Sequence, residues 1–157
     1  MKVESRAVEI RIEADAERRG PGILAGVLMP YGQRAQDRAE VFDPGSLHWP
    51  SDGVLLREMH VRARPIARFV PEATEDEVRV KILLPDTTAG RDAAANVRAG
   101  VLKGLSVEFR SEKETVRDGV RVIQRAHLVG AGLVDSGAYA GATVEARGKA
   151  RRRRVWL

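Results

Sequence analysis

The sequence contains no cysteine, few aromatic residues and no long apolar run. Without cysteine, disulfides and thiolate metal sites are excluded. Aromatic residues make up only 4% of the chain, so a core must be built from valine, leucine, isoleucine and alanine. No run of about 18 apolar residues is present, and the start does not have the charged-then-apolar pattern of a secretory leader. We therefore expect a soluble protein that stays in the compartment where it is made and has no membrane partner.

The positive charge of the chain is concentrated at its end. The 157 residues carry a formal net charge of +5, which would fall to −1 without the six basic residues of segment 147–157. The length suits one domain with a single core. We predict one domain over residues 1–146 and a basic, flexible tail over residues 147–157, which would also suit contact with an acidic scaffold protein or DNA.

Alternation of apolar and polar residues predicts a protein made mainly of strands. The predicted strands cover residues 6–14, 23–31, 39–42, 53–60, 65–70, 76–84, 105–109, 111–116, 120–123 and 127–134. The first two are expected to form a hairpin, and Asp118-Gly119 predicts another. Gly130 and Gly132 are expected to lie close to a neighbouring backbone, because glycine has no side chain to prevent it.

A short helix is predicted over residues 89–99, because this alanine-rich segment follows a threonine cap and is closed by Gly100. Asp43 and Pro44 suit the start of a further helical turn, in which His48 would have a surface or packing role. A helix against a mainly antiparallel sheet indicates an α+β class. We expect a closed or partly open β-barrel with two or three short helices.

Ser106 lies in a strand that follows two glycines. The odd-numbered residues of segment 105–109 are apolar, which places Ser106 and Glu108 on the opposite, polar face. We therefore expect Ser106 to be presented to solvent. Such a serine is a candidate nucleophile, but an ordinary surface serine has the same pattern, because a nucleophile also needs a base and oxyanion donors.

His60 ends the predicted strand 53–60, where alternation places it on the opposite face from Arg57. Imidazole is suited to general-base catalysis because it exchanges protons near neutral pH. By itself, a histidine at the end of a strand is more often a partly buried structural residue, and only its combination with the Ser106 block favours a catalytic role.

Several blocks of the chain, in this order, resemble the HK97-type phage prohead maturation proteases, which are related to the herpesvirus assembly proteases. The resemblance extends from about Ile23 to about Val144. Its blocks are Tyr31-Gly32, Glu40 to Ser46, His60, Pro65-Ile66, the Thr-x-Ala-Gly-Arg-Asp-Ala pattern at 87–93, Gly-Leu-Ser-Val-Glu-Phe at 104–109, and Leu133 to Tyr139.

This resemblance implies a serine endopeptidase with a herpesvirus-protease-like barrel and no cofactor or metal. Its substrates would be the major capsid protein and the scaffold domain of that protein, inside the assembling prohead in the cytoplasm of a bacterial host. Contacts with the portal or the prohead interior, and a homodimer like that of the herpesvirus enzymes, are further implications.

The resemblance assigns Ser106 as the nucleophile and His60 as the general base, with oxyanion donors among the backbone amides near the glycine-rich turn before Ser106. Many family members have a glutamate where this chain has Gly130. The third catalytic residue is therefore open.

The candidates for this third position are His127, which would echo the serine-histidine-histidine set of the herpesvirus enzymes, and then Asp135 or Glu58. A serine-histidine dyad without a third side chain is another arrangement. The missing glutamate also leaves open a catalytically weak or inactive protease-fold protein that serves as a structural part of the phage head. A small basic nucleic-acid-binding barrel is a more distant alternative, which the low aromatic content disfavours.

Overall fold

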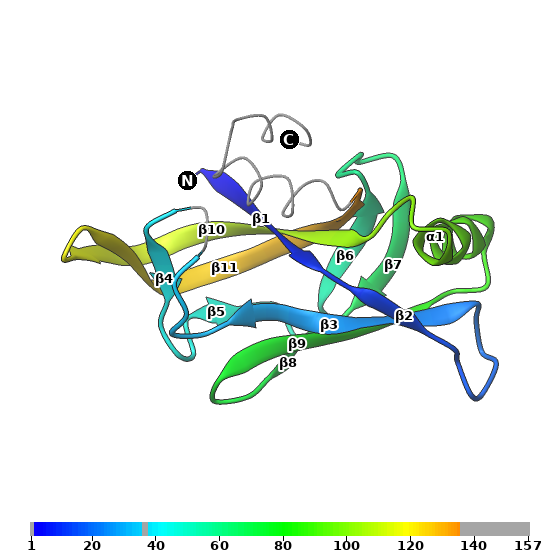
Figure 1. Ribbon diagram of the computed structural model, residues 1–157, viewed down its shortest axis with the longest axis horizontal. Helices are drawn as coiled ribbons and strands as arrows, with labels where there is room; N and C mark the ends of the chain where they lie inside the picture. Colours follow the sequence, from blue (N-terminus) through cyan, green and yellow to red (C-terminus); the bar gives the residue numbers. More distant parts are fainter. Residues whose placement is uncertain (1, 36–37, 136–157) are drawn as a thin grey trace.

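Two β-sheets packed face to face, with one helix at one end, form the fold in a computed structural model that describes residues 2–35 and 38–135 (Figure 1). The seven-stranded sheet contains β1 (Val3–Glu9), β4 (Glu40–Phe42), β5 (Leu47–His48), β6 (Val54–Glu58), β7 (Pro65–Phe69), β10 (Gly104–Arg117) and β11 (Val120–Val134). The four-stranded sheet contains β2 (Arg11–Glu13), β3 (Gly22–Pro30), β8 (Glu72–Ala73) and β9 (Glu77–Leu84), and the helix is α1 (Thr88–Arg98).

The core lies between the two sheets and is mostly aliphatic, as the composition predicts. In β9 the even-numbered residues 78–84 are buried and the odd-numbered ones are wholly or partly exposed. Leu105 and Phe109 of the larger sheet and Leu24 and Leu28 of the smaller one are completely buried in the same cluster. Period-two alternation therefore gives each sheet one apolar inner face.

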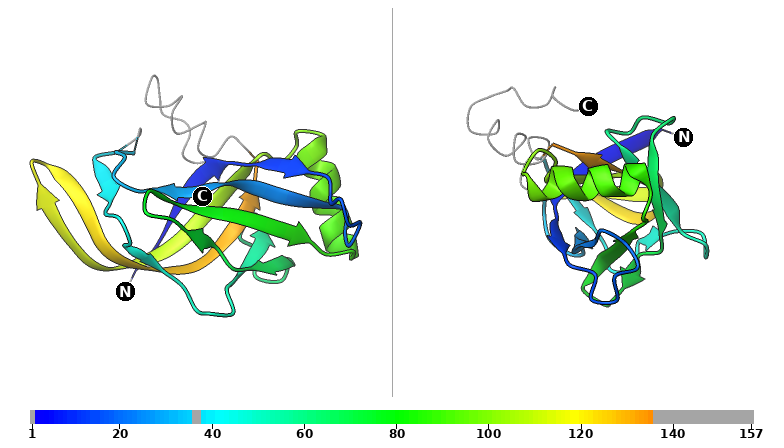
Figure 2. Two further views of the ribbon diagram at one scale, coloured as in Figure 1. Left: turned by 90° about the horizontal axis from the view of Figure 1, so that it is seen from below. Right: turned by 90° about the vertical axis from the view of Figure 1, so that its right-hand side faces the viewer.

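The long β10–β11 hairpin is the centre of the larger sheet, and its tip extends beyond the other strands (Figures 1 and 2). Asp118 and Gly119 form its turn with φ angles of 52° and 76°, as the sequence predicts for a two-residue hairpin loop. β1 pairs with β10 on one side, while the short strands β4, β5 and β6 pair in turn with the outer edge of β11. These last three pairings are parallel, so the sheet is mixed rather than antiparallel throughout.

The predicted first strand divides between the two sheets. β1 pairs with β10, whereas β2 pairs with β3, so only the β2–β3 part forms the predicted hairpin. The chain changes sheets at Ile10, whose N–H donates to the carbonyl of Lys103 and so continues the β1–β10 register by one residue before β2 begins.

The predicted helical turn after Asp43 is also wrong. Gly45 has a φ of 75°, and the N–H of Ser46 donates to the carbonyl of Asp43, which closes a tight turn that leads into β5. A left-handed residue ends a helical path, so the cap at Asp43 starts no helix.

α1 agrees with its prediction. Thr87 is the cap, because its Oγ1 accepts a hydrogen bond from the N–H of Gly90 at 3.0 Å, and Gly100 ends the helix with a φ of 77°. The helix packs against β2, β7 and β9 at one end of the sheets (Figure 2).

The fold is mostly β, and residues 2–35 and 38–135 contain one α-helix instead of the predicted two or three. Their strands form two open sheets rather than a closed barrel. The closed barrel is therefore not found in this part of the chain, and the likeness to the herpesvirus proteases stays a prediction. None of the described helical residues belongs to a helix long and apolar enough to cross a bilayer. The boundary at residue 146 and the basic tail lie outside the described residues.

Candidate active site

Ser106 and Glu108 lie on one face of β10, opposite two glycines of β11. In the antiparallel ladder Ser106 is paired with Gly132, and Glu108 with Gly130. Paired residues on antiparallel strands point to the same face of a sheet. The two glycines therefore leave space beside Ser106 and Glu108, on the face of the sheet away from the core.

Ser106 is completely buried, and the prediction that it faces solvent is wrong. Alternation places it correctly on the face opposite the core residues Leu105 and Val107. β10 is an inner strand with β1 and β11 on its two sides, however, and the outer face is covered at this point. Alternation predicts the face of a residue but not what covers that face.

A left-handed turn brings His60 to the same place. β6 ends at Glu58, and Met59 and His60 have φ angles of 49° and 61°. The left-handed region is unfavourable for residues other than glycine, by about 1–2 kcal/mol each, and such strain is concentrated at functional sites. The N–H of Met59 donates to the carbonyl of Leu133 at 2.9 Å, which fixes the turn against β11. The turn moves His60 to the face of Arg57, contrary to the prediction from alternation.

The imidazole of His60 occupies the space that a side chain at position 132 would fill. An ideal Cβ on Gly132 would lie 2.6–2.8 Å from Cε1, Nδ1 and Nε2 of His60. The close neighbour of Gly132 is therefore a side chain and not a backbone, whereas the nearest atom to a Cβ on Gly130 is the carbonyl oxygen of Leu55 at 3.3 Å. Because Gly132 is paired with Ser106, His60 lies directly beside Ser106 in the sheet.

Glu108 is the carboxylate beside His60. Its Oε2 lies 3.3 Å from Nδ1 of His60, which is ion-pair distance without hydrogen-bond alignment. The contact with His60 is the main cause that lowers the pKa of Glu108; the charges of His60 and Arg57 add to it, and burial opposes it. Glu108 is therefore ionised at neutral pH, as a group that orients an imidazole must be.

Unpartnered polar atoms are concentrated at this point. Within residues 2–35 and 38–135, the buried side-chain atoms without a hydrogen-bond partner are Oγ of Ser106, Nδ1 and Nε2 of His60, Nε of Arg57 and Oγ of Ser46. All but the last belong to the Ser106 face of the sheet, where Arg57 is paired with Gly132. A buried polar group without a partner costs about 1–3 kcal/mol, and such groups are rare outside functional sites.

The three residues expected at the third position lie elsewhere. His127 is paired with Arg110 and with His48, and its distance along β11 from Gly132 is about 16 Å. Glu58 binds Arg64, with Oε2 3.0 Å from Nε. Asp135 is exposed after the end of β11. In the described part of the chain, only Glu108 brings a carboxylate within ion-pair distance of His60.

The backbone amides of the turn before Ser106 are all occupied. Those of Gly100 to Lys103 donate to the carbonyls of Val97, Asn96 and Val134. They hold α1 to the start of β10, so this structure does not present them as oxyanion donors.

Sequence reasoning missed Glu108 and Arg57. Glu108 shares the predicted polar face of Ser106, which was the available signal. Its contact with His60 depends on the left-handed turn after β6, and no residue pattern in the sequence marks that turn.

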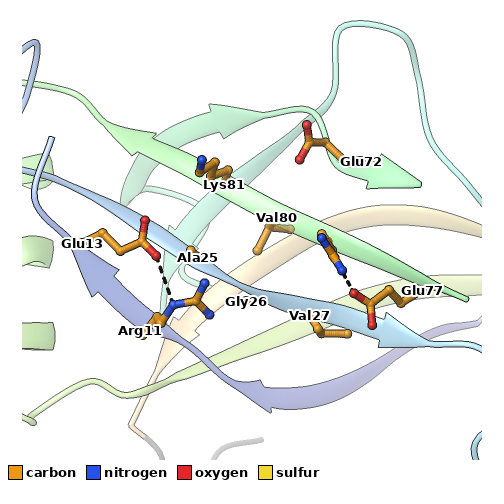
Figure 3. Close-up of a pocket in the computed structure, with 10 residues that line it drawn as sticks. Arg11, Glu13, Ala25, Gly26, Val27, Glu72, Glu77, Val80 and Lys81 are labelled. Carbon is orange, nitrogen blue, oxygen red and sulfur yellow. Dashed lines mark hydrogen bonds and ion pairs between the residues drawn. The ribbon is translucent and has the colours of Figure 1, made fainter. Parts of the chain in front are cut away.

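The larger of two grooves described in the structure is not at this site. It has a volume of about 470 Å³ and lies on the outer face of the four-stranded sheet (Figure 3). Its two arginines are each paired with a glutamate of the groove, Arg11 with Glu13 at 3.1 Å and Arg79 with Glu77. Neither Ser106 nor His60 lines it.

Two comparisons with known proteins found a match to this chain. The family model described as caudovirus prohead serine protease matches residues 29–154, which is most of the chain and includes both His60 and Ser106. In structure the chain is similar to the bacteriophage T4 capsid assembly protease, with 16% sequence identity, coverage of 83% of this chain and 95% of that chain, and a TM-score of 0.49. No curated protein sequence matches this chain.

Proposed function

Because the chain belongs to the caudovirus prohead serine protease family, we propose that Ser106 is its nucleophile, His60 its general base, and Glu108 the residue that positions His60. The observation that carries this assignment is the set of buried, unpartnered polar atoms of Ser106 and His60 around Gly132, next to the ionised Glu108. The family makes the protein a serine protease of phage head maturation; the roles of the three residues are our proposal.

In the proposed reaction, Oγ of Ser106 attacks the carbonyl carbon of the scissile peptide bond while His60 accepts the hydroxyl proton. His60 then donates that proton to the leaving amine, which leaves an acyl-enzyme on Ser106 for water to hydrolyse. Glu108 lies at Nδ1 of His60, so its negative charge stabilises the imidazolium that forms in each step.

Glu108 supplies the carboxylate that a glutamate at position 130 would otherwise provide. The resemblance to the HK97-type proteases leads one to expect a glutamate there, on β11. Glu108 is paired with Gly130 across the hairpin, and its Oε1 would lie 3.4 Å from a Cβ on Gly130. The carboxylate therefore comes from the neighbouring strand to the same part of the sheet. This removes the main reason for treating the chain as an inactive structural member of the fold.

The burial of Ser106 sets a condition for catalysis. The side chain of Ser106 has no exposed surface in this structure. The residues that cover it must therefore move before the carbonyl of a substrate can reach Oγ. During this movement the imidazole of His60, which lies beside Ser106, must keep its contact with Glu108.

The proposed substrates are the major capsid protein and its scaffold domain, and the proposed place of action is the interior of the prohead in the bacterial host. Contacts with the portal, dimerisation and a specific HK97-like or herpesvirus-like arrangement are proposed from the resemblance in sequence alone.

Co-expression with the major capsid protein of the same phage tests the assignment. We expect the wild-type protein to shorten the capsid protein to a product with a new, unique N-terminus, and we expect Ser106→Ala and His60→Ala to abolish that product. Glu108→Gln should lower the initial cleavage rate roughly 10⁴-fold, the order of magnitude found when the orienting carboxylate is removed from a catalytic triad.

Glu112→Gln is the matched control, because Glu112 is also on β10 but pairs with the exposed Arg125 at 3.0 Å. It should cleave at the wild-type rate. Cleavage that persists in Ser106→Ala would overturn the nucleophile, and a wild-type rate in Glu108→Gln would overturn the role of Glu108. If the folded wild-type protein leaves the capsid protein intact, the inactive alternative is correct.

A further inference from the structure

A cationic crevice lies next to the proposed catalytic residues. It has a volume of about 290 Å³ and is formed where the chain between β5 and β6 passes along the outer edge of β11. Its charged and titratable lining consists of Arg57, Arg68, Arg110 and His127, and no carboxylate lines it. Pro50, Gly53 and Leu55 are among the residues that supply the remaining wall.

The arginines of the crevice form few hydrogen bonds and ion pairs, although the charge of Arg57 also acts on the nearby Glu108. In the described residues, Arg110 has no hydrogen bond or ion pair, and Nε of Arg57 is buried without a partner. Arg68 donates to the carbonyl of Gly53 at 3.4 Å and is 3.9 Å from the carboxylate of Asp52, which is mostly exposed. By contrast, the arginines of the larger groove are each paired with a glutamate.

The crevice continues the row of proposed catalytic side chains. Ser106, Glu108 and Arg110 follow one another on the same face of β10, so Arg110 is about 13 Å from Ser106 along the strand. Arg57 forms the near wall, because it is paired with Gly132, the residue opposite Ser106. An extended peptide covers the span from Ser106 to the crevice in about two to four residues.

We propose that this crevice is a specificity subsite that binds an acidic side chain of the peptide substrate, two to four residues from the scissile bond. The inference rests on the proposed function of Ser106. Arginine binds a carboxylate with paired, charge-assisted hydrogen bonds, and such bonds are strongest where the donors are partly buried and have no other partner. Glu108 does not fill this role, because it is held by His60 and does not line the crevice.

Randomised peptides, acetylated and amidated at their ends so that no terminal carboxylate is present, test the subsite. We expect the wild-type protein to prefer glutamate over glutamine at least tenfold in kcat/KM at one position, two to four residues from the cleaved bond. The double variant Arg68→Gln/Arg110→Gln should reduce that preference to less than threefold, because kcat/KM falls for the glutamate peptide more than for the glutamine peptide. Arg79→Gln is the control, because it removes the same charge from the larger groove on the other sheet.

Two results would overturn the subsite while leaving the protease intact: equal cleavage of glutamate and glutamine peptides by the wild-type protein, or a preference that persists in the double variant. Binding of the same peptide pair to Ser106→Ala, measured by fluorescence anisotropy, provides a second readout that does not need turnover and should show the same tenfold difference. Absence of any cleavage by the wild-type protein, or cleavage by Ser106→Ala, would instead be a failure of the proposed function.

Discussion

Gly132 determines where the imidazole of His60 can lie. A side chain at this position would occupy the space of the ring, since its Cβ would be 2.6–2.8 Å from three of the ring atoms. Because the obstructing group is a side chain at the end of a turn, and not backbone, an added methyl group would displace the imidazole without disrupting the sheet. Gly132 is therefore needed for the position of the imidazole, and it contributes little to the stability of the fold.

Gly132→Ala should lower kcat/KM for peptide cleavage by about 10²-fold or more, because a displacement of about 1 Å in a catalytic group can cost that much. Its free energy of unfolding in urea should change by less than about 1 kcal/mol, since glycine within a strand is itself unfavourable. Gly130→Ala is the control: its Cβ meets its nearest neighbours only at 3.3–3.4 Å, and we expect a loss below tenfold. Full activity in Gly132→Ala would show that catalysis does not require the imidazole of His60 to lie over residue 132.

α1 and the turn after it determine where β10 begins. Thr87 caps the helix, Gly100 ends it, and the N–H groups of Val101 and Leu102 donate to the carbonyl of Asn96 in its last turn. The N–H of Lys103 then donates to Val134 at the end of β11. The start of the Ser106 strand is thus fixed on one side by the helix and on the other by its partner strand.

Thr87→Ala should lower the free energy of unfolding by about 1 kcal/mol, since it removes the acceptor for the N–H of Gly90. Thr88→Ala is the control, because Thr88 is exposed in the first turn of α1, where alanine is the better helix former. Urea denaturation followed by circular dichroism measures both variants. An equal loss in the two would argue against capping by Thr87.

At the scale of the whole molecule, an ion-pair network joins four strands of the larger sheet. Arg121 of β11 binds Glu4 of β1, Glu40 of β4 and Glu114 of β10, at 2.6–2.9 Å. Arg121 is the main cause that lowers the pKa of Glu4, and it is also the main cause that lowers the pKa of Glu114, to about 2. The network therefore ties the edge strand β1 to the tip of the hairpin.

The network should stabilise the protein above about pH 4.5 and lose this effect under more acidic conditions. Folding lowers the pKa of Glu114 from 4.5 to about 2, so its contribution is present above the unfolded value and is lost as the pH falls toward 2. Arg121→Gln should reduce stability at pH 7 and flatten its fall between pH 4.5 and pH 2 in urea titrations.

Arg125→Gln is the comparison for this prediction, because Arg125 forms an exposed pair with Glu112 and should leave the pH profile unchanged, as exposed pairs contribute little. An unaltered acid slope in Arg121→Gln would show that other carboxylates are responsible for the acid sensitivity.

Most of the elements could be predicted from the sequence, because they depend on local patterns. Alternation in β9, the cap and closing glycine of α1, and the Asp118-Gly119 turn each determine structure within a few residues. The same local patterns also place Ser106 on the face opposite the core.

The register of the β10–β11 hairpin could not be predicted by counting residues back from its turn. Arg117 is paired with Val120, so counting back from the turn would place Ser106 opposite Ala131, a buried core residue. Register shifts along the hairpin, one of them between Glu108 and Phe109, move its partner to Gly132. An extra residue in one strand changes which side chains share a face.

The sequence by itself determined the strands, the helix and the identity of Ser106 and His60 as the candidate nucleophile and base. The tertiary structure alone decided that Glu108 lies beside His60 and that His127, Asp135 and Glu58 do not. The physical reason is that these positions follow from a left-handed turn after β6 and from bulges in the ladder of the β10–β11 hairpin. The turn is held by β11, which is far from it in the chain, and the bulges shift the register of the hairpin, so local periodicity predicts neither.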